Sequence, residues 1–359
     1  MYVVIMAGGG GTRLRPVSTA ERPKPFLPLL PTGETLLQRT VRRLEGPELG
    51  PVDVYVVASA AYEGLVAAQV AGATLVVEPE GRNTAAAIAL AALAVDRPDD
   101  EVMVVLPADH RIDPAREGVF RAVLRDAADG LATGAFGVEA PLVTLGVQPT
   151  FPATQYGYLV PRHEAGERRL GLDAYPLAQF REKPDAEAAA ALLASPGTAW
   201  NAGMFLWRRG SIRAALEAHA PDVVAAVGAG LASGDLAGAY GGIAPRSIDY
   251  AVMEPAATAG SVLMAAMDVG WTDVGTWAVL LEVLGAGALD GTVVEAGTAA
   301  TTREGDLVVD RDHDGLVVRP ARDATMVAER PVALLRGAAA ALPIVQALLD
   351  RCAAAEARA

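Results

Sequence analysis

Four consecutive glycines follow a short apolar run at the start of the chain. The run is Tyr2–Ala7, and Gly8–Gly11 come next, before Thr12 and Arg13. Glycine has no Cβ, so its backbone N–H groups can approach and cradle phosphate oxygens. The segment lacks the Gly-Lys-Ser/Thr of a Walker A loop, and Arg13 stands where a GxGxxG motif has glycine. A flexible turn is the alternative, but Arg13 and the nearby Lys24 favour a phosphate-binding loop.

Lysine is rare in this chain. Of 30 cationic residues only Lys24 and Lys183 are lysines, and each is followed by proline. A lysine carries a compact point charge, whereas arginine carries a planar fork. Chance retention of lysine is one interpretation, but because arginine is the usual cation here, the pattern favours two positions where the guanidinium fork would not fit.

Two aspartates occupy positions that suit a divalent cation. Asp109 follows the apolar run 102–106, and Asp273 lies in the tryptophan-flanked segment 271–277. Mg²⁺ takes one or two carboxylates together with phosphate oxygens and waters. A capping or turn role is the alternative for Asp109. His110 is more typical of a packing residue than of a metal ligand.

The glycine loop, taken with Pro23-Lys24-Pro25-Phe26-Leu27, resembles the signature of the sugar-1-phosphate nucleotidylyltransferases. Five further segments make the chain similar to the bacterial mannose-1-phosphate guanylyltransferases. They are residues 80–84, 180–184, 200–205, 247–254 and 271–277. The resemblance runs from residue 2 to about residue 335, and such an ordered set of motifs is far more specific than a glycine loop alone.

The resemblance implies a reaction in which GTP and α-mannose 1-phosphate give GDP-mannose and pyrophosphate. The sugar-phosphate oxygen would attack the α-phosphorus in line, without a covalent intermediate. Catalysis of that kind depends on positioning and on neutralising charge.

The resemblance also implies a role for each motif. The catalytic cations are Arg13 at the departing pyrophosphate, Lys24 at the nucleotide phosphates and Lys183 at the sugar phosphate. The nucleotide is held by Gly8, Gly9, Gly10, Gly11, Thr12, Arg82, Asn83 and Thr84. The sugar is bound by Gly157, Glu182 and Asn201, and Mg²⁺ is held by Asp109 and Asp273. A direct substrate role for Asp249 is left open.

Three positions depart from the usual family pattern. Arg15 stands where tryptophan is frequent, Ala202 where serine is common, and Arg181 where an apolar residue is frequent. They bear on the fine sugar preference more than on the reaction. Two alternatives remain: transfer to glucose 1-phosphate from UTP or dTTP, and a non-catalytic sensor of nucleotide sugars.

Alternating strand and helix patterns surround the motifs. Strand-like runs at 2–7, 53–58, 74–77 and 102–106 alternate with helix-like runs at 34–44, 60–71, 84–95 and 114–128. This alternation predicts an α/β, Rossmann-like domain with a mainly parallel sheet covered on both faces. Ligands in such sheets lie past the carboxyl ends of strands, which here means after Ala7, Val77 and Leu106.

The pattern of residue types along the sequence changes near Gly285. Short β-branched clusters separated by glycine and aspartate predict a small β-rich, short β-helix-like appendage that ends in a helix over 338–355. The predicted domains are 1–284, the nucleotidyltransferase domain, and 285–359. The appendage is shorter than the cupin-type isomerase domain that many relatives carry, so a monofunctional enzyme is expected.

Composition limits the partners. The net charge of −13 and a pI near 4.8 argue against binding nucleic acid or an anionic membrane. A single cysteine, Cys352, excludes an internal disulfide. The opening residues lack a signal pattern, and no apolar run is long enough to span a bilayer. We therefore expect a cytoplasmic enzyme whose partners are GTP and mannose 1-phosphate, with a homodimer through an exposed strand edge left open.

Overall fold

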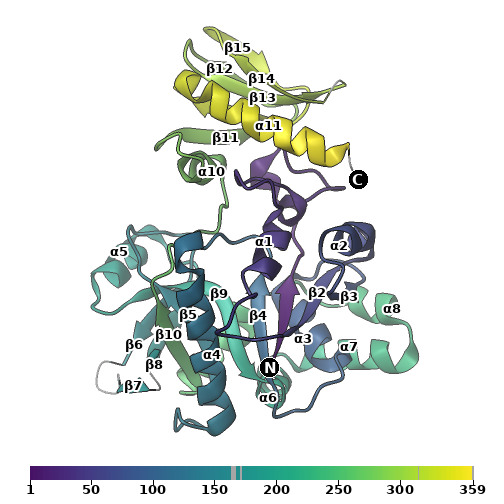
Figure 1. Cartoon of the computed structure of the whole chain (residues 1–359), viewed down its shortest axis with the longest axis vertical. Helices are drawn as coiled ribbons and strands as arrows, with labels where there is room; N and C mark the ends of the chain where they lie inside the picture. The colour runs from purple at the N-terminus through teal and green to yellow at the C-terminus, as the bar shows by residue number, and fades with distance from the viewer. Residues whose placement is uncertain (163–166, 170–171, 314, 358–359) are drawn as a thin grey trace.

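The computed structural model describes residues 1–162, 167–169, 172–313 and 315–357. In this part of the chain ten strands form one sheet, in the order β3-β2-β1-β4-β9-β5-β10-β8-β6 with β7 beside β8 (Figure 1). The strands are β1 (Tyr2–Met6), β2 (Asp53–Ser59), β3 (Thr74–Glu78), β4 (Val102–Pro107), β5 (Leu142–Val147), β6 (Tyr158–Pro161), β7 (Glu167–Arg169), β8 (Leu172–Arg181), β9 (Ala199–Arg208) and β10 (Val262–Met267).

The sheet is parallel in its first half and mixed in its second. β1 pairs in parallel with β2 and β4, and β2 pairs in parallel with β3, as the alternating pattern predicts. β9 instead runs antiparallel to both β4 and β5, and β8 runs antiparallel to β10 and β6. The expected parallel pairing therefore holds for β1 to β4, whereas most pairs in the second half of the sheet are antiparallel. β10 still pairs in parallel with β5, so this half of the sheet combines both orientations.

Helices cover both faces of the large sheet (Figure 1). One face carries α1 (Leu36–Arg42), α2 (Glu63–Gln69), α4 (Glu117–Thr133) and α5 (Ala186–Ala194). The other carries α3 (Asn83–Ala94), α6 (Arg209–His219), α7 (Pro221–Ser233), α8 (Leu236–Gly241) and α9 (Glu254–Thr258). No helix in the described ranges is long and apolar enough to cross a membrane.

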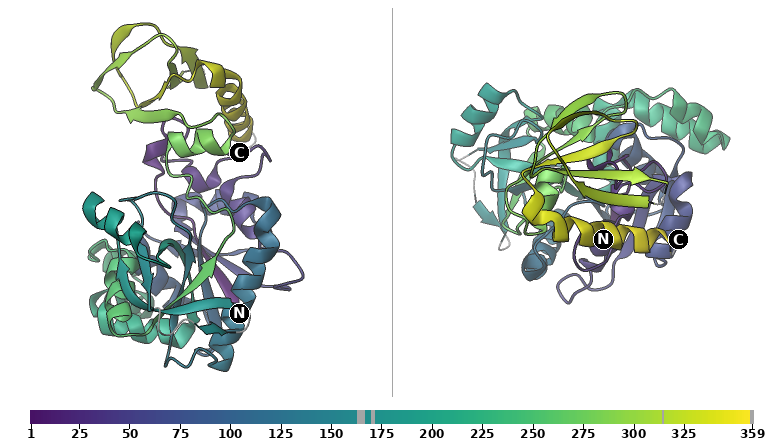
Figure 2. Two further views of the ribbon diagram at one scale, coloured as in Figure 1. Left: turned by 90° about the vertical axis from the view of Figure 1, so that its left-hand side faces the viewer. Right: turned by 90° about the horizontal axis from the view of Figure 1, so that it is seen from above.

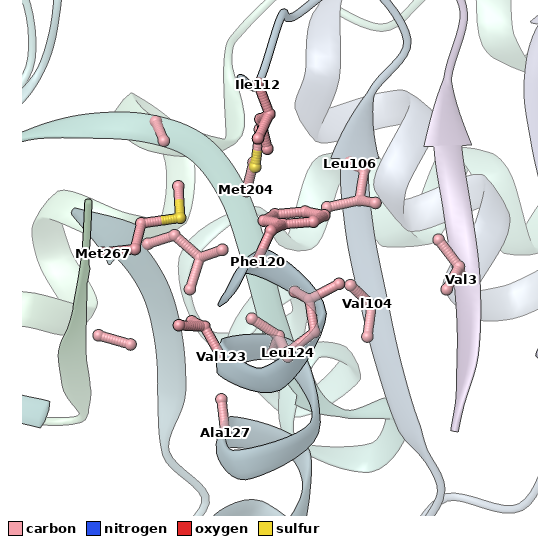
Figure 3. Close-up of a cluster of buried hydrophobic side chains, with 14 of the residues drawn as sticks. Val3, Val104, Leu106, Ile112, Phe120, Val123, Leu124, Ala127, Met204 and Met267 are labelled. Atoms are coloured by element: carbon pink, nitrogen blue, oxygen red, sulfur yellow. The ribbon is translucent and has the colours of Figure 1, made fainter. Parts of the chain in front are cut away.

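Phe120 of α4 anchors the first of these faces. It is fully buried and packs against Val104, Leu106 and Met204 from the sheet (Figure 3). Burying a side chain of this size contributes about 1.5–3 kcal/mol. On the opposite face, α3 is buried all round from Ala85 to Ala92, because its small side chains let the sheet and α7 approach it closely.

The C-terminal residues form a separate β-rich layer that ends in a helix (Figure 2). Its elements are α10 (Trp277–Val283), β11 (Asp290–Val294), β12 (Ala299–Thr302), β13 (Leu307–Asp312), β14 (Gly315–Pro320), β15 (Ala324–Val327), β16 (Val332–Arg336) and α11 (Leu342–Glu356). The β-rich appendage closed by a helix is confirmed. Its β-helix-like character is wrong, because β11-β16-β13-β14 and β12-β15 pair antiparallel, whereas the rungs of a β-helix stack in parallel.

The C-terminal layer, defined here as residues 277–357, packs onto the segment that follows the glycine loop. Leu14, Val17 and Leu29 share one buried cluster with Trp277 and Leu335. Helix α10 precedes the predicted division at residue 285 but belongs to the same cluster. The division into two domains remains a prediction, and the hydrophobic contacts join the two parts.

Candidate active site

The glycine loop leaves β1 at the carboxyl edge of the sheet. Gly9 and Gly11 have φ values of 95° and 56°, which glycine adopts without strain. A Cβ at Gly11 would lie 2.7 Å from the Cβ of Lys24. Any other residue at position 11 would therefore push the loop away from Lys24. The glycines thus allow the loop backbone to lie directly against this lysine.

A cavity of about 250 Å³ opens beside the loop, and we call it the phosphate cavity. Its lining residues are Gly8, Gly9, Gly11, Thr12, Arg13, Leu14, Lys24, Asp109 and Gly275. Most of the glycine-loop residues that were predicted to bind the nucleotide therefore line this single cavity. Gly10 is exposed and does not line this cavity.

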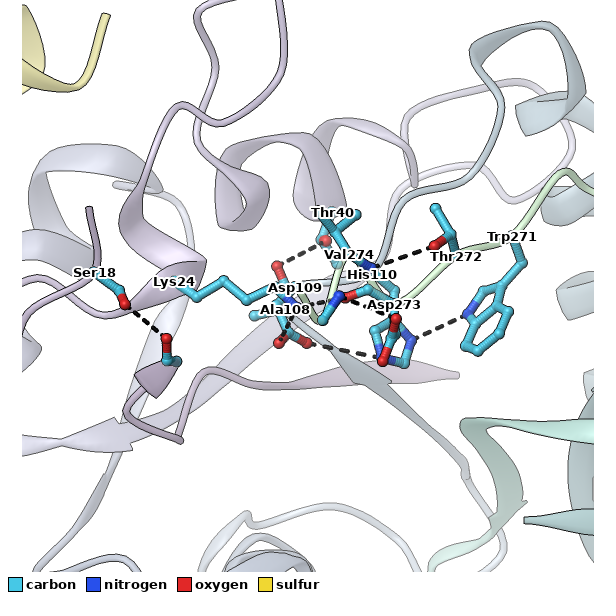
Figure 4. A network of polar contacts seen from close by, with 12 residues as sticks. Ser18, Lys24, Thr40, Ala108, Asp109, His110, Trp271, Thr272, Asp273 and Val274 are labelled. Atoms are coloured by element: carbon cyan, nitrogen blue, oxygen red, sulfur yellow. Dashed lines mark hydrogen bonds and ion pairs between the residues drawn. The ribbon is translucent and has the colours of Figure 1, made fainter. Parts of the chain in front are cut away.

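Lys24 joins the two predicted metal ligands (Figure 4). Its side chain is 7% exposed, and its Nζ donates to Asp109 Oδ2 at 2.8 Å and to the backbone oxygen of Asp273. Burial alone would raise the pKa of Asp109, but the Lys24 ammonium opposes it most strongly, and the pKa lies below its usual range. Asp109 is therefore an anion at neutral pH.

Among the described residues, neither Asp273 Oδ2 nor Asp109 Oδ1 accepts a side-chain hydrogen bond. Asp273 Oδ1 accepts from the Tyr156 hydroxyl and the Gly275 N–H, both at 3.0 Å. Asp109 Oδ1 lies 3.9 Å from His110 Nε2. The described residues contain no cluster of three metal-ligating side chains. Two carboxylates with free oxygens beside a phosphate-sized cavity still fit a divalent ion that takes its other ligands from phosphate and water.

His110 supports the aspartates rather than offering a ligand. The Trp271 indole N–H donates to His110 Nδ1 at 3.1 Å, and the two rings meet edge to face. Burial lowers the pKa of His110, against the opposing effect of Asp109. The ring is therefore neutral, and it fixes Trp271 next to the predicted metal ligands.

A second group of polar residues lies at the ends of β8 and β9. Lys183 Nζ contacts Glu182 Oε1 at 3.1 Å, and Asn201 Nδ2 donates to Asp249 Oδ1 at 2.8 Å. Glu182 Oε2 is buried and has no hydrogen-bond partner in the described part of the chain, and a Cβ at Gly157 would lie 2.4 Å from it. A buried carboxylate oxygen without a donor suits a ligand hydroxyl. The structure thus brings together the residues predicted to bind the sugar, and we call this group the sugar subsite.

Burial, and next the Asp249 carboxylate, raise the pKa of Glu182 to about 7. Because this folded-state value lies above the ordinary 4.5, stability should fall as pH rises from about 4.5 through 7. Glu182→Gln removes the charge, so its melting temperature should gain more over the wild type at pH 8 than at pH 5. Thermal melts at both pH values test this, and an equal difference at both would contradict it.

The predicted base-binding turn lies on the far side of the glycine loop. A cavity of about 430 Å³, called here the base cavity, is lined by Met6, Gly8, Gly9, Val57, Glu78, Gly81, Asn83, Thr84, Ala87 and Pro245. Asn83 and Thr84 therefore line it as expected. The Arg82 guanidinium instead bonds to Glu80 and to the Gly241 carbonyl oxygen, each at 2.6 Å, and does not line it.

Glu78 in the base cavity is a residue that the sequence motifs did not identify. Its Oε1 accepts from the Tyr240 hydroxyl at 2.9 Å, and its Oε2 faces Gly8 and has no bonded donor among the described residues. Burial raises the pKa of Glu78, although Tyr240 opposes this. The sequence contained one indication of this role, a carboxylate at the end of a strand and next to a turn. Its contact with Tyr240, 162 positions away, could not be read from the sequence.

Strained backbone marks three of the turns that face these cavities. Asn83, Lys183 and Val274 have φ values of 68°, 42° and 46°. Each such residue costs on the order of 1–3 kcal/mol, and a β-branched valine is a clear outlier. The strain falls in the predicted base-binding turn, at the lysine predicted to bind the sugar phosphate, and beside Asp273. Backbone strain at ligand-facing turns is typical of functional sites.

A family model described as "Nucleotidyl transferase" matches residues 2–286. The chain belongs to this family. A Sinorhizobium fredii protein described as a mannose-1-phosphate guanylyltransferase is 38% identical over 345 residues, which cover 90% of this chain and 64% of that protein. An Escherichia coli K12 protein with the same description is 38% identical over 353 residues, covering 92% and 70%. This nucleotidyl transferase thus spans about two thirds of the length of these relatives.

The fold of this nucleotidyl transferase is also found in solved structures. A Thermus thermophilus protein described as a mannose-1-phosphate geranyltransferase matches with a TM-score of 0.64 and 35% identity, covering 79% of this chain and 78% of that one. The predicted family and its α/β nucleotidyltransferase fold are confirmed. Members of the family generally use a divalent metal, in line with the paired aspartates.

Proposed function

We propose that this nucleotidyl transferase moves GMP from GTP to α-D-mannose 1-phosphate and releases GDP-mannose and pyrophosphate. The observation that carries the proposal is the presence of two separate cationic sites for two phosphates. Arg13 and Lys24 line the phosphate cavity, while Lys183 stands beside the orphaned oxygen of Glu182. Relatives described as mannose-1-phosphate guanylyltransferases favour guanine and mannose over UTP or dTTP with glucose 1-phosphate.

The chain's own residues position the reaction. The loop backbone and Arg13 hold the β- and γ-phosphates, and Lys183 holds the sugar phosphate with one oxygen facing the α-phosphorus. That oxygen attacks, the bond from the α-phosphorus to the pyrophosphate oxygen breaks, and pyrophosphate leaves with its charge near Arg13. Lys24 keeps Asp109 and Asp273 in place. A Mg²⁺ ion held by these aspartates would supply further neutralisation of phosphate charge.

The sugar subsite supplies hydrogen bonds to mannose. Glu182 Oε2 can accept from a sugar hydroxyl, and the second N–H of the Asn201 amide can donate to another. Asn201 Oδ1 already accepts from Thr144 Oγ1 at 2.8 Å and from the Gly203 N–H at 3.1 Å. Its amide orientation is therefore fixed, with Asp249 taking the opposite side.

Glu78 gives the base cavity a preference for guanine. A free carboxylate oxygen can accept from the adjacent N1–H and 2-amino groups of guanine, whereas uracil and thymine offer a single N–H flanked by two carbonyl oxygens. Glu78→Gln should therefore lower kcat/KM for GTP about tenfold and leave that for ITP, which lacks the 2-amino group, less affected. Steady-state kinetics with GTP and ITP measure this. An equal fall in kcat/KM for GTP and for ITP would contradict a role of Glu78 in recognising the base.

Several further expectations complete the proposal. Mg²⁺ is the expected divalent ion, GTP and mannose 1-phosphate are the expected partners, and the acidic surface disfavours nucleic acid and anionic membranes. A cytoplasmic location and a homodimer remain predictions. Sedimentation at several protein concentrations tests the dimer.

Pyrophosphate release from GTP and mannose 1-phosphate in the presence of Mg²⁺ tests the function. We expect turnover that requires both substrates and stops with a chelator. Turnover only with UTP or dTTP and glucose 1-phosphate would contradict the substrate assignment. GDP-mannose binding without any turnover would contradict catalysis and favour a sensor.

A further inference from the structure

Three cavities lie in a row along the glycine loop. The base cavity shares Gly8 and Gly9 with the phosphate cavity, and the phosphate cavity shares Thr12 and Arg13 with a third cavity of about 370 Å³. A nucleoside triphosphate whose base lies in the first would direct its β- and γ-phosphates through the second toward the third. The third cavity also has lining residues between 291 and 295, which belong to none of the motifs.

The C-terminal layer forms the outer wall of this third cavity, which we call the outer cavity. Its lining residues are Thr12, Arg13, Thr276, Gly291, Thr292, Val293 and Glu295. Three threonine hydroxyls and one guanidinium are donors that phosphate oxygens accept from. Gly291 lets β11 approach closely, because a Cβ there would lie 2.7 Å from the Cβ of Trp277.

The same layer holds the loop that carries Arg13. The Trp277 indole N–H donates to the Arg15 carbonyl oxygen at 2.9 Å, and Arg311 Nε donates to the Pro16 carbonyl oxygen at 3.2 Å. Leu14 is buried in the cluster that Trp277 also joins. The position of Arg13 is therefore set partly by the C-terminal layer.

One carboxylate in the outer cavity would oppose an anion. Glu295 lines the cavity, and its Oε2 pairs with Arg15 Nη1 at 3.3 Å. This pair is partly exposed, so its contribution to stability is small. Its position matters for a ligand, because the Arg15 guanidinium lies against the Glu295 carboxylate and would offset its repulsion of an anion in the cavity.

We propose that the outer cavity is a pyrophosphate subsite and that the C-terminal layer contributes Thr292 to it. This inference rests on the proposed function, in which pyrophosphate leaves past Arg13. Arg15 acts as a positioning residue that cancels the charge of Glu295. In the reverse reaction a pyrophosphate oxygen attacks the α-phosphorus of GDP-mannose, the bond to the mannose 1-phosphate oxygen breaks, and GTP forms.

Kinetics of the reverse reaction test the subsite, because pyrophosphate and GDP-mannose can be varied separately. Thr292→Val keeps the shape and removes the hydroxyl, and it should raise KM for pyrophosphate about fivefold with little change in KM for GDP-mannose. Arg15→Gln should also raise KM for pyrophosphate, and Glu295→Gln should lower it. The double variant Arg15→Gln/Glu295→Gln should return close to the wild-type value.

Arg330→Gln is the matched control, since Arg330 pairs with Asp310 at 2.9 Å in the same layer without lining the outer cavity. It should leave KM for pyrophosphate unchanged. If Thr292→Val behaved like this control, or if KM for both substrates rose together, the subsite would be wrong.

Calorimetric titration with inorganic pyrophosphate separates this inference from the proposed function. Binding that weakens in Thr292→Val but not in Arg330→Gln supports the subsite even if no GDP-mannose is made. Equal pyrophosphate binding in all variants of a protein that does make GDP-mannose overturns the subsite and leaves the function standing.

Discussion

Asp273→Asn is expected to lower kcat for GMP transfer by about 10²-fold or more while the protein stays folded. An asparagine Oδ1 can still accept from Tyr156 and Gly275, so the turn should survive. The amide nitrogen replaces the free oxygen, which removes both a charge and a ligand from the predicted Mg²⁺ site. Asp109→Asn should have a similar effect, with the added loss of the ionic partner of Lys24.

The measurement is kcat over a titration of Mg²⁺, with a melting curve for each variant. Asp185→Asn is a suitable control, because Asp185 caps α5 through its side chain and asparagine caps helices equally well. Near-normal turnover of both active-site variants at saturating Mg²⁺ would refute the paired aspartates.

Lys24→Arg is expected to be as damaging, although it preserves charge. Lys24 is 7% exposed, lies against Gly11, and contacts both aspartate residues through one ammonium. A longer, planar guanidinium cannot occupy that space without moving the loop or Asp109. A displacement of about 1 Å at the reacting phosphate can reduce the rate by about 10²-fold.

Lys183→Arg should be milder. The rarity of lysine suggested that neither position accepts arginine, but the Lys183 side chain is 52% exposed and has room. Its replacement should mainly raise KM for mannose 1-phosphate, because its partner is the sugar phosphate. Steady-state kinetics with each substrate varied in turn compare the two variants. Wild-type kinetics for Lys24→Arg would show that catalysis does not depend on the buried Lys24 ammonium.

Local patterns predicted the first half of the fold well. The runs before residue 107 alternate cleanly, and β1 to β4 with α1 to α3 lie where the patterns indicate. The glycine loop and Asp109 were predicted to lie at the same sheet edge because each follows a strand, and Lys24 was assigned to the same site by the family resemblance.

The parts that sequence patterns did not predict depend on contacts between distant residues. β9 lies antiparallel between β4 and β5, and this position depends on its hydrogen bonds to these distant strands and not on the local strand preference of its own residues. The link from Lys24 to Asp273 spans 249 positions, and the support of Arg15 by Trp277 spans 262. No periodicity within either segment indicates the partner of these residues.

A competition experiment tests the central claim most directly. The purified chain is incubated with Mg²⁺, equal amounts of GTP, ATP, UTP, CTP and dTTP, and equal amounts of the 1-phosphates of mannose, glucose, galactose and N-acetylglucosamine, and the nucleotide sugars are identified by mass spectrometry coupled to chromatography. The account predicts GDP-mannose as the dominant product, formed in equal amount with pyrophosphate. Another nucleotide sugar as the main product, or no nucleotide sugar at all, would contradict it.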